Sequence, residues 1–282
     1  MASSVRGIGG PISTGAWADA FNALGRMLGV AGPAFVAVTL VSAVPLLWLG
    51  SHPFHPAADA TLWRSAWSAA LRGGMVGWPA GVLEAVLMTP VAIAIHRLIL
   101  LGEVTAFYRL DLGSKRFRRF AGYMLVLNIG STLLIASGAL LGFLSTIVAV
   151  VVCLALWIGA TIIGTRLVLL FPSIAIDSRH ADWQGAMALS RHHAWSIFGA
   201  LLVTSLLGGL LSLIQLPLEF LGVAVVAGGN FVLGNLIKAA GQALLHILIT
   251  AALVAAASRI YRNLSGPDEP EAIAPPQAGL AL

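Results

Sequence analysis

The longest uncharged stretch of this chain constrains its fold more than any other feature. Residues 120–165 are 46 consecutive positions without Lys, Arg, Asp or Glu. As one helix they would be about 69 Å long at 1.5 Å per residue, more than twice the ~30 Å hydrocarbon core of a bilayer. The stretch must therefore fold back, which predicts two membrane spans, 121–141 and 144–170, separated by a short turn near Gly138 and Gly142.

Four more apolar stretches predict spans at 30–49, 76–101, 197–220 and 231–257. The composition agrees, because 59% of the residues are hydrophobic, only 10% are charged, and the mean hydropathy is +0.93. We therefore predict an all-α polytopic membrane protein with six transmembrane helices in a bundle, 30–257. Residues 1–29 are predicted to form a cytoplasmic interfacial helix. Residues 258–282, rich in Pro in their second half, are predicted to be a disordered cytoplasmic tail.

The basic residues predict the orientation, because loops rich in Lys and Arg stay in the cytoplasm. Threading six spans puts thirteen of them on the side of the two termini and three on the other. The three are Arg64, Arg72 and Lys238. We therefore expect both termini in the cytoplasm of a bacterial cell and the spans in its inner membrane.

Three short helices are predicted outside the spans. Ser13 or Thr14 is expected to cap the first, whose apolar stripe suits the membrane surface. That stripe consists of Trp17, Phe21, Leu24 and Leu28. A similar stripe at 62–71 predicts a second surface helix in the first external loop. In the fourth loop, Asp182 is expected to cap a helix that runs to Arg191.

Ionisable and amide side chains within spans indicate function or helix pairing, because they are costly in hydrocarbon. Those in this chain are Glu84, Glu219, Asn235, Lys238, Gln242 and His246. The last four follow one another by three or four residues and so share one face of the sixth span. This polar stripe is expected to look into the bundle or a water-filled cavity. Interhelical hydrogen bonding explains it better than a transport path, which stays open.

Glu84 and Lys238 are predicted to pair within the membrane. Both lie roughly 10 to 12 Å from the outer surface at 1.5 Å per residue, so their depths match. Attraction between them would offset the cost of burying each charge. Glu219 is the competing partner for Lys238, although its place near the boundary allows it to reach water.

A basic segment precedes the third span and alternates with aromatic residues. Its cations are Lys115, Arg116, Arg118 and Arg119. Such a cluster beside a span meets anionic lipid headgroups, at about 1 kcal/mol per basic residue. We therefore predict membrane lipids as partners on the cytoplasmic side, and no nucleic acid.

Residue types for catalysis or metal binding are present but poorly arranged. Ser131 or Ser137 with His246 supplies a serine and a histidine, without the local pattern of a nucleophile. Two groups of ligand types have weak metal spacing, namely His52, His55 and Asp59, and Asp177, His180, Asp182, His192 and His193. Cys153 is the one cysteine of the sequence. We expect no enzyme activity, no metal and no cofactor.

Three span ends share a polar residue followed by arginine: His96-Arg97, Thr165-Arg166 and Ser258-Arg259. Topology and the helix dipole explain this better than a threefold repeat, which stays open. The segments 166–176 (RLVLLFPSIAI), 186–190 (AMALS) and 195–199 (WSIFG) resemble those of six-span bacterial inner-membrane proteins, the YciC-type proteins and the membrane domain attached to some glycerophosphodiester phosphodiesterases. The resemblance implies a membrane protein without established chemistry. The hydrolase domain is not in this sequence, so we expect no phosphodiesterase activity.

These observations predict an integral inner-membrane protein that acts as a non-enzymatic membrane- or lipid-associated accessory protein. The alternative is a small transporter or permease-like protein that uses the polar stripe of the sixth span.

Overall fold

The structure is a computed structural model that describes residues 9–51 and 62–265. The described residues form nine α-helices, which are α1 (Gly9–Arg26), α2 (Leu28–Ser51), α3 (Leu62–Leu101), α4 (Lys115–Leu144), α5 (Thr146–Leu167), α6 (Leu170–Ala175), α7 (Trp183–Ser190), α8 (Ala194–Ala227) and α9 (Phe231–Ser265). Six of them, α2, α3, α4, α5, α8 and α9, are long and apolar enough to cross a membrane. The prediction of an all-α chain with six spans is confirmed, and it is compatible with an integral, multi-pass membrane protein.

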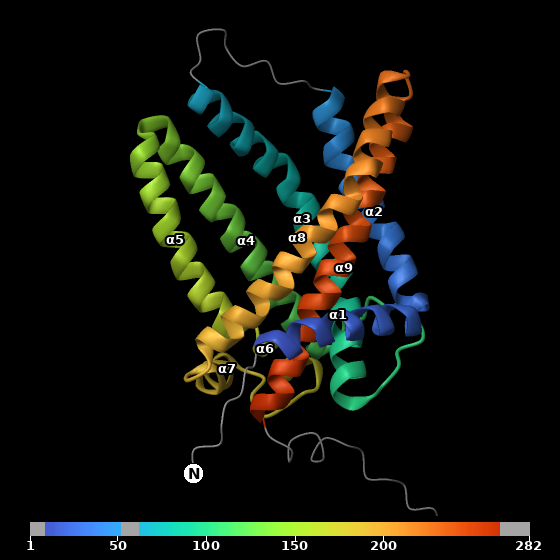
Figure 1. Ribbon diagram of the computed structural model, residues 1–282, viewed down its shortest axis with the longest axis vertical. Helices are drawn as coiled ribbons and strands as arrows, with labels where there is room; N and C mark the ends of the chain where they lie inside the picture. The colour runs from blue at the N-terminus through green and yellow to red at the C-terminus, as the bar shows by residue number, and fades with distance from the viewer. Residues whose placement is uncertain (1–8, 52–61, 266–282) are drawn as a thin grey trace, which may run out of the picture.

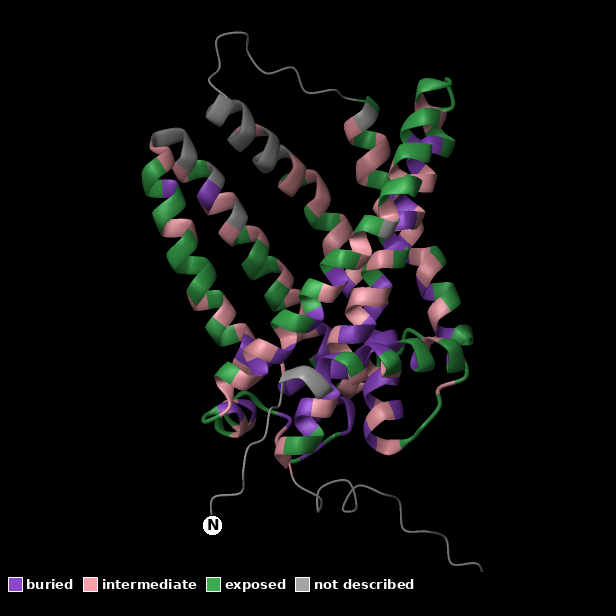
Figure 2. Ribbon diagram, viewed as in Figure 1, coloured by how far each residue is buried: buried purple, intermediate pink, exposed green. Residues whose placement is uncertain are grey.

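Helix α9 is the centre of the packed core. It contacts α1, α2, α3 and α8, and alanines dominate its buried face. Small side chains allow helix backbones to approach closely, which is how membrane helices gain contact without a strong hydrophobic drive. The buried residues gather where α9 meets α1, α6 and the end of α3, as Figure 2 shows.

The α4–α5 hairpin stands apart from this core. In Figure 1, the C-terminal end of α5 and the N-terminal end of α8 lie close together near α7, and the two helices diverge toward the opposite end of the molecule. Only 6% of the apolar stretch of α5 is buried, against 50% of that of α9. The hairpin is therefore held by α3 along α4 and by α8 near one end of α5.

The turn between α4 and α5 is at Ser145, not at Gly138 and Gly142 as predicted. Ser145 is extended (φ −158°, ψ 121°), its N–H donates to Leu141 O at 2.9 Å, and its hydroxyl accepts from the backbone N–H of Val148 at 3.5 Å. Serine thus caps the second helix, a role glycine has no side chain to perform. Gly138 instead serves close packing, since a Cβ there would lie 2.2 Å from Cys153 Sγ on α5.

The predicted surface helix at 62–71 is not a separate element. It is the first part of α3, which continues without a break to Leu101. Four glycines, Gly73, Gly74, Gly77 and Gly81, and two prolines, Pro79 and Pro90, lie inside the helix. Helices in membranes accommodate such residues, because the surrounding apolar medium strongly favours intact backbone hydrogen bonds.

The start and the buried face of helix α1 differ from the prediction. It begins at Gly9, so Ser13 and Thr14 lie inside the helix and do not cap it. Trp17 is buried, but Phe21 and Leu28 of the predicted stripe are 54% and 69% exposed. The buried face instead carries small and flexible side chains, Ile12, Ser13, Ala16, Ala20, Ala23 and Met27, which let α1 lie against α8 and α9.

Several helix ends also differ from the predicted boundaries. Helix α5 ends at Leu167, because Pro172 follows within the short helix α6 and cannot donate to the preceding turn. Helix α8 continues to Ala227. Helix α9 continues to Ser265 with Ser258 and Tyr261 buried, so the predicted disordered tail does not begin at 258. The rest of that tail, 266–282, lies outside the described residues.

One short helix agrees with its prediction. The carboxylate of Asp182 accepts from Gly185 N at 2.6 Å and caps α7 at Trp183.

Candidate functional site

Glu84 does not pair with Lys238. Its Oε1 accepts a hydrogen bond from Ser42 Oγ on α2 at 2.6 Å, and the ion pairs within the described part of the chain do not include either residue. The prediction was wrong because it matched depth without knowing which helices are neighbours. Lys238 lies on the side of α9 that meets α8, where a Cβ on Gly222 would come within 2.6 Å of its Cγ.

The polar stripe of α9 does not line an enclosed path. Asn235 is buried and donates to Phe231 O of its own helix at 3.0 Å. Gln242 and His246 are exposed, so these two residues are not packed inside the bundle, and the alternative that the stripe faces a water-filled cavity stays a prediction. Glu219 accepts from Gln215 Nε2 at 2.8 Å, one turn earlier on α8, and so has a partner within its own helix.

The basic segment forms the start of α4. Ser114 caps the helix by accepting from Phe117 N at 3.0 Å, and Phe117 and Phe120 are buried. Lys115, Arg118 and Arg119 are therefore turned outward and are exposed. Arg116 is different. Its Nε donates to Asp177 Oδ2 at 3.0 Å, which ties α4 to the segment after α6. A hollow of about 210 Å³ lies between Lys115, Arg116 and Arg119 on one side and the 174–181 segment on the other.

Buried hydrogen bonds hold the same end of the molecule together, and the sequence did not predict them. His96 Nδ1 on α3 and Ser258 Oγ on α9 are 2.7 Å apart. Tyr261 OH donates to Ser178 Oγ at 2.8 Å. In the loop after α3, Tyr108 OH donates to Leu87 O at 2.8 Å, and burial raises the pKa of Tyr108 from its ordinary value. The repeated polar residue before each span-end arginine was the available signal for His96 and Ser258.

The residues that could bind a metal ion do not form a cluster in the described part of the chain. Within the described ranges no three His, Cys, Asp or Glu side chains form a group suited to a metal ion. Asp177 pairs with Arg116, Asp182 caps α7, and His180 accepts from Arg179 Nε at 3.2 Å. His52, His55 and Asp59 lie outside the described residues.

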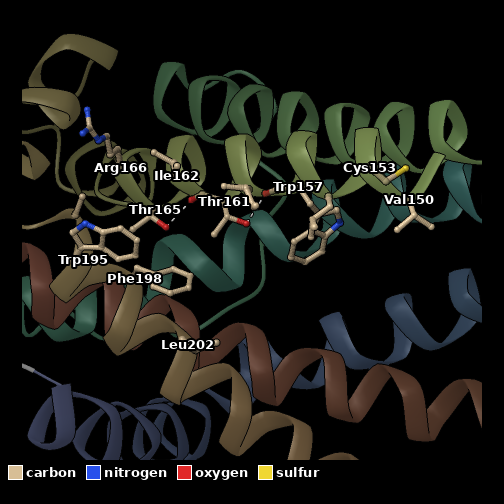
Figure 3. Close-up of a pocket in the computed structure, with 13 residues that line it drawn as sticks. Val150, Cys153, Trp157, Thr161, Ile162, Thr165, Arg166, Trp195, Phe198 and Leu202 are labelled. Carbon is tan, nitrogen blue, oxygen red and sulfur yellow. Dashed lines mark hydrogen bonds between the residues drawn. The ribbon is translucent and has the colours of Figure 1, made fainter. Parts of the chain in front are cut away.

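A large hollow lies between α5 and α8, and we call it the α5–α8 groove. Its volume is about 910 Å³. Its lining residues, shown in Figure 3, are Val150, Cys153, Leu154, Trp157, Ile158, Thr161, Ile162, Thr165, Arg166, Ala194, Trp195, Phe198 and Leu202. Val150 and Cys153 lie at one end of it, and Arg166 and Trp195 at the other. From Val150 to Arg166 the helix rises about 24 Å.

The groove is apolar along its length. Thr161 Oγ1 donates to Trp157 O at 2.8 Å and Thr165 Oγ1 donates to Thr161 O at 2.7 Å. These bonds satisfy both hydroxyls within α5, so the threonines present mainly their methyl groups. Trp157 and Trp195 are 64% and 82% exposed, and Trp195 stands edge-on to Phe198 with ring centroids 6.0 Å apart. The walls therefore suit hydrocarbon chains.

Arg166 is the one charged residue of the groove lining. Its Nε is enclosed and has no hydrogen-bond partner. Among the described residues, Arg166 forms no ion pair. The arginines at the other two span ends are neutralised, Arg97 by Glu103 and Arg259 by Asp19. Sequence reasoning treated Arg166 only as a topology signal and did not identify the groove.

No family model, curated protein or solved structure matches this chain. The resemblance to the YciC-type proteins therefore stays a prediction.

Proposed function

We propose that this protein is a non-enzymatic, lipid-associated accessory protein of the bacterial inner membrane, and that the α5–α8 groove holds the acyl part of a membrane lipid. The observation that carries the proposal is the groove itself, an apolar hollow of about 910 Å³ between two helices that are each suited to cross a membrane. Ligand sites in proteins have volumes of about 300 to 1,000 Å³ and mostly apolar walls.

The position of the groove favours lipid as its occupant. It is bounded by α5 and α8, and α5 is the least buried of the six candidate spans. In a bilayer its open side meets acyl chains directly. Its length of about 24 Å exceeds one leaflet, which is about half of the 30 Å hydrocarbon core, so a chain entering from the Arg166 end fits lengthwise.

The same proposal includes the basic start of α4. Lys115, Arg118 and Arg119 are exposed beside a span, where cations attract anionic headgroups. Arg116 is excluded from this set because it holds Asp177. With these residues on the cytoplasmic side, both termini are cytoplasmic, in line with the thirteen-to-three distribution of basic residues. Replacing the three exposed cations by Gln should weaken retention of anionic lipid. Unchanged retention would remove the basic segment from the proposal.

The transporter alternative is not favoured. It requires the polar stripe of α9 to line a path, but Asn235 bonds to its own helix, and neither Gln242 nor His246 lines the α5–α8 groove.

Two tryptophan substitutions on α5 test the groove. Leu154 lines it, whereas Leu156, two positions away, is exposed on another face of the same helix. In purified protein, a lipid with a photoreactive group in its acyl chain should crosslink to groove residues, and unlabelled lipid should compete. Leu154→Trp should reduce this crosslinking, and the matched control Leu156→Trp should not. Equal crosslinking on all faces of α5, or equal effects of the two variants, would contradict the proposal.

A further inference from the structure

We propose that the α5–α8 groove selects a glycerophospholipid and that Arg166 binds its phosphodiester. This inference rests on the proposed function, since it assigns the headgroup chemistry of the lipid whose acyl part occupies the groove. The structure gives three independent reasons for it: the place of Arg166 near the end of α5, its missing counter-charge and the lack of any other charged group in the lining.

The place of Arg166 near the end of α5 suits contact with a lipid headgroup. It is the penultimate residue of α5, and Trp195 faces it from the second position of α8. Tryptophans concentrate at the level of the headgroups, because the ring is apolar and its N–H requires a polar partner. Arg166 lines the groove, and its guanidinium is directed away from Phe198.

The missing counter-charge distinguishes Arg166 from the other span-end arginines. Arg97 and Arg259 each meet a carboxylate, whereas Arg166 has an enclosed Nε without a partner. A buried donor without an acceptor destabilises the fold by about 1 to 3 kcal/mol, and more when the group is charged. A bound phosphate supplies the missing counter-charge, because its oxygens fit the planar donors of a guanidinium.

The remaining lining cannot discriminate between headgroups. Thr161 and Thr165 already donate to their own helix, and the other walls are apolar apart from Cys153 and the indole N–H groups of Trp157 and Trp195. Arg166 is therefore the lining residue whose charge can select a phosphate. The groove itself supplies affinity for acyl chains whatever the headgroup, so removing Arg166 should abolish selectivity while sparing binding.

Lipid competition measured by native mass spectrometry tests whether Arg166 determines headgroup selectivity while the apolar walls determine binding. Delipidated protein is offered equal amounts of phosphatidylethanolamine and diacylglycerol with identical acyl chains, because a headgroup without net charge separates the contact at Arg166 from the attraction of anionic lipid to the basic start of α4. The wild-type protein should retain the phospholipid about tenfold or more over diacylglycerol, as expected for one charge-assisted hydrogen-bonded contact. Arg166→Gln should lower this ratio close to one with the total bound lipid unchanged. Arg166→Lys, which keeps the charge, should retain part of the selectivity.

Arg262→Gln is the matched control, because Arg262 is exposed near the end of α9 and does not line the groove. It should leave the ratio unchanged. A wild-type protein that retains neither lipid overturns the proposed function as well as this inference. A wild-type protein that retains both equally, or an Arg166→Gln variant that stays selective, overturns only the assignment of Arg166. Equal retention of a free fatty acid would show that any anion suffices and would overturn the phosphodiester assignment.

Discussion

The His96–Ser258 pair between α3 and α9 allows a quantitative prediction of stability. Ser258 Oγ donates to Val254 O at 2.9 Å, so its hydroxyl hydrogen is already used. Within the pair, 2.7 Å apart, Ser258 must therefore accept and His96 Nδ1–H must donate. This assignment leaves His96 Nε2 as a bare acceptor, and it is enclosed without a partner.

The two single substitutions should therefore differ in cost. Ser258→Ala leaves a buried Nδ1–H without an acceptor, which should lower the free energy of unfolding by about 1 to 3 kcal/mol. His96→Leu removes the unpaired Nε2 together with the donor and leaves Ser258 bonded to Val254. Replacing a polar pair by apolar groups is often nearly neutral, so we expect the double variant to be more stable than Ser258→Ala alone.

A double-mutant cycle provides the measurement. The four proteins are unfolded reversibly by SDS in mixed micelles, and their free energies of unfolding are compared. We expect Ser258→Ala to cost less than about 0.5 kcal/mol in the His96→Leu background, where it only removes a bond within one helix. Equal costs of Ser258→Ala in both backgrounds would refute the assigned donor and acceptor roles.

Further perturbations test the rest of the structure. Glu84→Gln and Lys238→Met should have additive effects in a thermal-melt cycle, because Glu84 bonds to Ser42, and a coupling above about 0.5 kcal/mol would contradict the separation of the two charges. Gly222→Leu should lower the melting temperature strongly, since its side chain would collide with Lys238 and the backbone of α9; an unchanged melt would argue against the close α8–α9 contact. The raised pKa of Tyr108 means that the folded protein holds this proton more tightly than the unfolded chain, so stability should fall as the pH rises above about 10, and Tyr108→Phe should lessen the fall, as measured by melts across pH. A phosphatase reporter fused after Leu282 should be inactive, and an active fusion would overturn the cytoplasmic placement of the C-terminus.

The features that the sequence predicted are those set by hydropathy and local capping. The 46-residue uncharged stretch required two helices, and the number of spans followed from similar stretches. Asp182 has a carboxylate at the start of a short helix, so its cap was visible in advance. The turn at Ser145 was missed because glycine was weighed as a helix breaker, whereas in this chain Gly138 lets α4 approach Cys153 on α5.

Features that depend on which helices are neighbours were not predictable from one sequence. Glu84 and Lys238 were matched by depth, but α3 places Glu84 against Ser42 of α2 while Lys238 packs against α8. The face of α5 that lines the groove has no sequence signature, because α5 is apolar on every side and all its faces look alike. The feature that distinguishes this face is Arg166. It lacks the carboxylate partner that Arg97 and Arg259 have at the other two span ends.

The most direct test of the central claim is an electron cryo-microscopy structure of the wild-type protein in lipid nanodiscs. We predict a lipid in the α5–α8 groove, with an acyl chain beside Trp157 and the phosphate within hydrogen-bonding distance of the Arg166 guanidinium. A groove closed by direct contact between α5 and α8, or covered by a second copy of the chain, would contradict the account.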